Sequence, residues 1–134
     1  MFVDASALVA ILLDEADADR MAAALDNADS ITEPHLTSPV AIFETVAALM
    51  RTKGCSRSVA EQWVRAALDA ARIAVVPITE EIGRAALDAF DRYGKGRRHP
   101  AQLNMGDCFA FACARVHGMA LLYKGDDFVR TELG

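Results

Sequence analysis

The sequence predicts an α/β fold in which helices cover both faces of a central, mostly parallel sheet. Short apolar segments rich in β-branched residues alternate with longer segments of helical periodicity, the pattern of parallel strands joined by helices. The chain has 134 residues, the usual size of one domain. Hydrophobic residues make up 53% of it and charged residues 25%, enough apolar material for a core between two helical layers. We therefore expect residues 1–134 to form a single domain.

The N-terminal half of the chain is expected to contribute two strands and three helices. Ser6 can cap a helix that runs through Leu13, because its hydroxyl can accept a hydrogen bond from a free N–H at the helix start. Pro39 suits the first turn of the third helix, and Gly54 suits its end. In order, we expect a strand at 1–3, a helix through residue 13, a helix at 15–28, a strand at 35–38 and a helix at 40–51.

The C-terminal half continues the alternation of helix and strand. Ser58 and Glu61 have the spacing of a capping box. Thr79 is the expected N-cap of the next helix, which Gly94 ends, and Asn104 is the expected N-cap of the last helix. In order, we expect a helix through residue 71, a strand at 73–78, a helix through residue 93, a polar loop at 95–103, a helix at 105–117 and a strand at 120–123.

Acidic residues from separate segments are expected at one edge of this sheet. Asp4 ends the first strand, Asp107 lies in the first turn of the last helix, and Asp126 and Asp127 follow the last strand. Glu44 interrupts an otherwise apolar helix, and the pattern leaves its direction open. Open α/β sheets bind their ligands beyond the carboxyl ends of the strands. These acids are therefore the candidate site.

Such a cluster requires a counter-charge. Carboxylates about 5 Å apart repel by roughly 3 kcal/mol per pair at an effective dielectric constant near 20. Oxygen ligands without histidine or thiolate favour Mg²⁺ or Mn²⁺ over zinc or copper. One or two such ions can activate a water molecule and stabilise the charge that develops on a phosphodiester. The sequence therefore points to hydrolysis of a nucleic-acid backbone.

Each acid also has a purely structural explanation. Asp4 can be an anion favoured at a helix N-terminus, and Asp107 can be a capping acid. Glu44 can be a solvated helix residue, while Asp126 and Asp127 can form a surface turn. Only the convergence of separate segments on one sheet edge favours the functional interpretation.

Other classes of protein share part of the pattern. A receiver domain needs an acid pair after its first strand and a lone aspartate after a central strand, which this sequence lacks. A dehalogenase-like, metal-dependent phosphatase needs Asp-x-Asp, but Ser6 occupies the place of the second acid. A catalytically silent module that binds RNA or protein would be free to lose the acids, yet all of them are present.

Because the chain is acidic overall, binding of RNA would require a local group of basic residues or a bound metal ion. With 14 basic and 19 acidic residues, the formal net charge is −5, which does not attract a polyanion. One polar loop is basic, and its side chains Lys95, Arg97 and Arg98 are the candidates to hold RNA phosphates. These side chains can equally be an ordinary solvated surface.

The chain is expected to be cytoplasmic and not to enter a membrane. Its longest apolar runs are far shorter than the ~20 residues of a membrane span. Asp4 stands where a secretory signal would carry lysine or arginine. Cys55, Cys108 and Cys113 form no CxxC pair, so we expect reduced, mostly buried thiols.

Three motifs carry a resemblance to a known family. They are FVDASAL at 2–8, LNMGDCFAFA at 103–112 and LLYKGDDF at 121–128. The basic loop and Pro100 lie between the first and second motifs, as expected for the family. Together they resemble a PIN domain, specifically the VapC toxins of VapBC toxin–antitoxin systems. The likeness spans nearly the whole chain and implies a PIN-like α/β/α sandwich.

The resemblance also implies an activity and a set of site residues. It implies a Mg²⁺-dependent endoribonuclease in which Asp4 and Asp107 bind the metal ion directly and Glu44 is the second acid. Ser6 would support the site through hydrogen bonds. The ending departs from the family's Thr-x-Asp-x-Asp-Phe pattern, so the fourth acid is either Asp126 or Asp127. Asp126 is our expected site residue, with its neighbour in support.

Two kinds of protein partner follow from the same resemblance. A VapB antitoxin would place its C-terminal segment in an apolar groove near the site and a basic residue among the carboxylates. A homodimer is also implied, with the helix at 40–51 among the candidates for its interface, or a larger toxin–antitoxin assembly.

Overall fold

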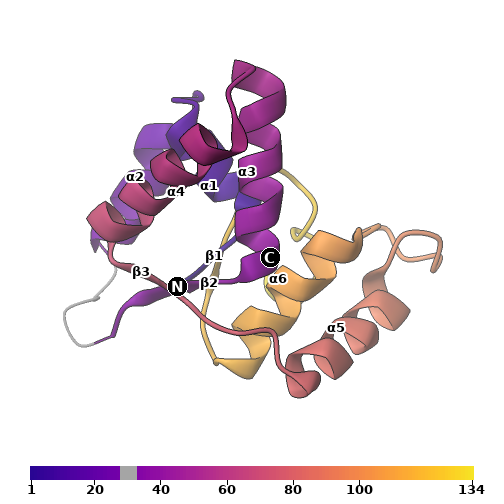
Figure 1. Cartoon of the computed structure of the whole chain (residues 1–134). Coiled ribbons are helices and arrows are strands. Elements are labelled where there is room, and N and C mark those ends of the chain that lie inside the picture. Colours follow the sequence, from indigo (N-terminus) through magenta and orange to yellow (C-terminus); the bar gives the residue numbers. More distant parts are fainter. Residues whose placement is uncertain (28–32) are drawn as a thin grey trace.

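A parallel four-stranded sheet forms the centre of the computed structural model, which describes residues 1–27 and 33–134 (Figure 1). The strand order is β3-β2-β1-β4, and each neighbouring pair is parallel. The carboxyl ends of the strands therefore share one edge, and the predicted fold class is confirmed. The strands are β1 (Phe2–Val3), β2 (His35–Thr37), β3 (Ile73–Val75) and β4 (Leu121–Leu122).

Helices pack on both faces of the sheet. Successive residues of a strand point to opposite faces, so Phe2 and Val3 enter two different apolar clusters. The cluster around Val3 is built by the first four helices, and the cluster around Phe2 by the last two (Figure 1). The helices are α1 (Ala5–Leu12), α2 (Ala18–Asn27), α3 (Pro39–Lys53), α4 (Arg57–Ala71), α5 (Glu80–Tyr93) and α6 (Met105–Val116).

Two helices begin two residues earlier than the sequence predicted. Asp4, and not Ser6, caps α1, since its carboxylate accepts a hydrogen bond from the Ser6 N–H at 3.1 Å. Ser56, and not Ser58, caps α4, and its hydroxyl accepts from the Val59 N–H at 3.2 Å. Each predicted cap competed with another preferred capping residue two positions earlier, and the earlier residue has the extended backbone that a cap requires.

The other helix ends agree more closely with the predictions. Thr79 and Asn104 are the N-caps of α5 and α6, and Gly54 ends α3 with a φ of 63° that favours glycine. The second helix begins at Ala18 instead of position 15, and its expected end at position 28 lies outside the described residues. The third strand stops at Val75, shortly before a proline that cannot donate a ladder hydrogen bond.

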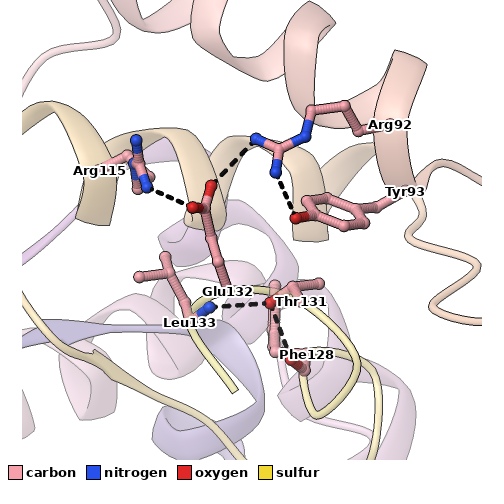
Figure 2. Close-up of polar contacts among 7 residues, drawn as sticks. All are labelled: Arg92, Tyr93, Arg115, Phe128, Thr131, Glu132 and Leu133. Carbon is pink, nitrogen blue, oxygen red and sulfur yellow. Dashed lines mark hydrogen bonds and ion pairs between the residues drawn. The ribbon is translucent and has the colours of Figure 1, made fainter.

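The segment after β4 closes over α5 and α6, a packing that the sequence did not predict (Figure 2). Phe128 is 1% exposed and packs edge-on against Tyr123, with ring centroids 5.0 Å apart. Glu132 accepts from Arg92 of α5 at 3.0 Å and from Arg115 of α6 at 2.8 Å. The two ion pairs, together with the buried ring, hold this segment in place.

The expectations about membranes and thiols can be compared with the fold. No helix within residues 1–27 and 33–134 is long and apolar enough to cross a bilayer. The three cysteines are free thiols, as predicted. Burial raises the pKa of Cys108 and of Cys113 to about 11, which keeps both thiols protonated and unreactive near neutral pH.

Candidate active site

The first site residue, Asp4, lies where β1 ends and α1 begins. Its side chain is buried, with 5% exposed, and accepts from both the Ser6 N–H at 3.1 Å and the Ser6 hydroxyl at 2.6 Å. The same hydroxyl accepts from the Lys124 backbone N–H at 2.9 Å. Ser6 thus joins the Asp4 carboxylate to the segment after β4 through its hydroxyl group.

The second site residue, Asp107, lies in the first turn of α6. Its Oδ2 accepts from the Asn104 N–H at 3.1 Å, and the Asn104 side chain accepts from the Asp107 N–H at 2.9 Å, a complete capping box. Asp107 therefore does act as a capping acid. However, only one carboxylate oxygen makes this bond, and the side chain is 8% exposed at the edge where Asp4 also lies.

A glycine brings the third acid, Glu44, to the same place. Glu44 projects from α3 toward α6, and a β-carbon at Gly106 would overlap both of its carboxylate oxygens. Any larger residue at this position would displace Glu44. Sequence reasoning did not assign a role to Gly106, although glycine in a helical first turn costs helix propensity and is a signal of a close contact.

The carboxyl groups interact strongly with one another. Burial raises the pKa of Asp4, and the charge of Asp127 raises it further against the hydrogen bonds from Ser6. Burial and then Asp4 raise the pKa of Glu44 to about 7. Burial raises the pKa of Asp107 to about 7, with contributions from Asp127, Asp4 and Glu44 against the bond from its capping partner. Acids from the junction of β1 and α1, from α3, from α6 and from the segment after β4 therefore lie close enough to act on one another. We call Asp4, Glu44, Asp107 and Asp127 the acidic cluster.

The structure brings Asp127, and not Asp126, to this cluster. The charge of Asp127 acts on both Asp4 and Asp107, while Asp126 is not among the groups that raise their pKa values. The chain turns at Gly125 with a φ of 96°, and Asp126 then accepts a hydrogen bond at its backbone carbonyl within the next turn. The family resemblance left both residues open and favoured Asp126, whereas these charge effects favour its neighbour Asp127 as the fourth acid.

The cluster is chemically suited to a hard divalent cation. Within residues 1–27 and 33–134, no three acidic, histidine or cysteine side chains already stand around a single ion position. Mg²⁺ does not need such a cage, because it usually binds through one or two carboxylates and keeps several of its waters. Buried carboxyl groups with raised pKa values gain most from a cation, and the donors are all oxygen.

The basic loop lies beside the N-terminus of α6. Its two ends meet where the Lys95 N–H donates to the Leu103 carbonyl at 2.8 Å, next to the cap of α6. Lys95, Arg97 and Arg98 are exposed, and Arg97 pairs with Asp91 at 2.7 Å. These cations are therefore close in the chain to Asp107 and remain accessible to solvent.

Comparisons of the sequence identify its relatives. A model of the PIN domain family matches residues 1–133. A VapC ribonuclease of Rhizobium meliloti (strain 1021) is 43% identical over 143 residues, and the match covers 99% of each chain. Ribonuclease VapC30 of Mycobacterium tuberculosis (strain CDC 1551 / Oshkosh) is 40% identical over 136 residues, which covers 99% of this chain and 95% of the relative.

Solved structures share the fold at lower identity. The crystal structure of the Mycobacterium tuberculosis toxin VapC20, described as a Sarcin-Ricin loop cleaving toxin, matches with a TM-score of 0.70 and 22% identity over 96% of this chain and 92% of that one. A toxin-antitoxin complex from Klebsiella pneumoniae matches with a TM-score of 0.66 and 17% identity, over 98% of this chain and 92% of that one. From the family match and the relatives together, the chain belongs to the PIN domain family and, within it, to the VapC ribonucleases.

Proposed function

We propose that this protein is the endoribonuclease toxin of a toxin–antitoxin system and that it hydrolyses RNA phosphodiester bonds with Mg²⁺ or Mn²⁺. The observation that carries the proposal is the convergence of buried carboxyl groups whose pKa values are raised by burial and by one another. Such a cluster destabilises the fold unless a cation or a proton neutralises it. Membership of the VapC ribonucleases supports RNA as the substrate.

The residues of the cluster would have different tasks. Asp4 and Asp107 would bind the ion directly, and Ser6 would fix the Asp4 carboxylate through its two hydrogen bonds. Asp127 replaces Asp126 in our assignment as the fourth acid, because its charge acts on both of the proposed ligands. When bound, the ion would activate water and stabilise the charge that develops on the phosphate.

Glu44 is the residue best suited to proton transfer. In the metal-free protein, burial and the charge of Asp4 raise the pKa of its carboxyl group to about 7. Because Glu44 is not one of the proposed metal ligands, its oxygen would be free to accept a proton from the attacking water. Its contact with Gly106 fixes the direction from which it approaches the cluster. Without a metal ion, this pKa also leaves a large fraction of Glu44 protonated at neutral pH.

RNA binding would depend on the basic loop. Lys95, Arg97 and Arg98 would hold phosphates on one side of the cut, which offsets the acidic surface implied by the net charge of −5. Phosphate contacts position the RNA without selecting a sequence. A cytoplasmic location follows from this function, because the substrate is cellular RNA.

The expected protein partners are a VapB-type antitoxin and a second copy of the chain. The Klebsiella pneumoniae neighbour is a toxin-antitoxin complex, which supports the first partner. A basic antitoxin side chain at the acidic cluster would form charge-assisted hydrogen bonds and exclude the metal ion. Phe43 and Met50 of α3 are 75% and 37% exposed, which supports α3 as part of a homodimer interface.

Purified protein without antitoxin tests the catalytic proposal. We expect it to cut RNA with Mg²⁺ or Mn²⁺, and we expect EDTA, Asp4→Asn or Asp107→Asn to abolish the cutting. Asp126→Asn serves as the matched control and should retain activity. Full cleavage by the Asp107→Asn protein would remove Asp107 from the mechanism.

The same preparation separates the other classes of protein. Release of phosphate from a small phosphoester, without RNA cleavage, would favour a phosphatase. Binding of RNA without any cleavage in Mn²⁺ would favour a catalytically silent module. For the toxin role, expression of the protein alone should arrest bacterial growth; normal growth at high protein levels would contradict it.

A further inference from the structure

An ion pair between distant segments lies next to the acidic cluster. Lys124 Nζ donates to Glu15 Oε2 at 2.6 Å, and the two side chains are about one-third exposed, at 33% and 32%. Lys124 lies two residues after the end of β4. Glu15 lies in the turn after α1, where its N–H donates to the Ala10 carbonyl at 2.9 Å. The pair therefore joins the segments that carry Asp127 and Asp4.

The backbone of Lys124 is only two hydrogen bonds from the Asp4 carboxylate. Its N–H donates to Ser6 Oγ at 2.9 Å, and Ser6 Oγ donates to Asp4 Oδ2 at 2.6 Å. A lysine has a flexible four-carbon stem and a compact ammonium group. The stem is long enough for the ammonium group to span the two hydrogen bonds that separate the Lys124 backbone from the Asp4 carboxylate. Without Glu15, the ammonium group could turn from the α1 side toward the buried carboxylates.

An ammonium group in the acidic cluster would oppose metal binding. Its positive charge would relieve the mutual repulsion of the carboxylates. That repulsion is also what favours binding of a divalent cation, so the two cations would compete. We propose that Glu15 is a positioning residue that holds the Lys124 ammonium group away from the acidic cluster and keeps the cluster open to a divalent cation. This inference rests on the metal-dependent function proposed above.

The variant that tests the inference is Glu15→Gln, which keeps the shape of the side chain and removes its charge. We expect its dissociation constant for Mn²⁺ to rise about fivefold or more, the lower end of the usual range for coupled neighbouring sites. The free Mn²⁺ signal in electron paramagnetic resonance measures this directly, without RNA. The matched control is Glu80→Gln, which loses an exposed ion pair with Arg84 at 3.2 Å on α5. Its Mn²⁺ affinity should equal that of the unchanged protein.

Removing the lysine should reverse the effect. Lys124→Met in the Glu15→Gln background removes the competing ammonium group, so Mn²⁺ affinity should return to within about twofold of its original value. Lys124→Met alone should bind Mn²⁺ as tightly as the unchanged protein or more tightly, because it retains the Glu15 charge nearby. If the ion pair is merely structural, Mn²⁺ should bind more weakly to both single variants and also to the double variant.

The outcomes are distinct. Unchanged Mn²⁺ affinity in Glu15→Gln would overturn the inference, and so would a loss of affinity that Lys124→Met fails to restore. If Glu15→Gln does not fold, weaker Mn²⁺ binding by Lys124→Met alone would overturn it. Absence of Mn²⁺ binding and of RNA cleavage in the unchanged protein would instead overturn the proposed function itself.

Discussion

Replacing Asp107 with asparagine should make the metal-free protein more stable at pH 8 while it abolishes RNA cleavage. The asparagine side chain keeps an oxygen that can accept the Asn104 N–H, so the capping box survives. The substitution removes a buried negative charge that faces Asp127, Asp4 and Glu44. A residue that we propose as a metal ligand is therefore predicted to lower the stability of the metal-free protein.

The size of the effect follows from the pKa of Asp107. Its carboxyl group ionises near 3.8 when unfolded and at about 7 in the fold, so ionisation costs the folded state up to about 4 kcal/mol at about 1.4 kcal/mol per pH unit. Because the folded pKa is the higher one, this cost is absent below pH 4, grows between about pH 4 and pH 7, and is complete above. The loss of an anion at the start of α6 and relaxation around the cluster reduce the gain, so we expect about 1–3 kcal/mol at pH 8.

Urea unfolding in EDTA at pH 5 and pH 8 measures this difference. Asp107→Asn should exceed the unchanged protein in free energy of unfolding at pH 8, and the gap should shrink at pH 5. Asp126→Asn is the control and should show no such gap, because Asp126 is not among the groups that raise the pKa of Asp4 or Asp107. A variant that is equally stable or less stable at pH 8, or a gap independent of pH, would refute the electrostatic reasoning.

Three further predictions follow from the same geometry. The metal-free unchanged protein should have a higher melting temperature at pH 5 than at pH 8, because carboxyl groups with raised pKa values destabilise the fold as they ionise. Calorimetry should show a smaller difference between the two melting temperatures when Mg²⁺ is present. Asp127→Asn should weaken Mn²⁺ binding about tenfold while Asp126→Asn changes it less than about twofold; equal effects would contradict our choice of the fourth acid. Gly106→Ala should cut RNA at least about tenfold more slowly by displacing Glu44, yet remain helical by circular dichroism because alanine favours helix; unimpaired cleavage would show that this contact is unimportant.

Much of the fold was accessible from the sequence because local patterns determine it. Periodicity and turn residues predicted that each of these strands and helices exists. The spacing of Asn104 and Asp107 also offered a capping box as one explanation of Asp107, and that capping box is present. The sequence could not decide between Asp126 and Asp127, because the positions of both carboxyl groups depend on the backbone turn at Gly125, which has a φ of 96°. Contacts between distant elements were equally hidden, such as the two ion pairs of Glu132, since no local spacing encodes them.

Both proposed metal ligands also help to cap a helix. Asp4 caps α1 and Asp107 completes the capping box of α6, and asparagine can serve both caps as well as aspartate can. A single-base change in either codon would therefore yield an inert protein that still folds. Under the proposed function, such a copy would retain the surfaces of the active toxin and compete with it for the same antitoxin.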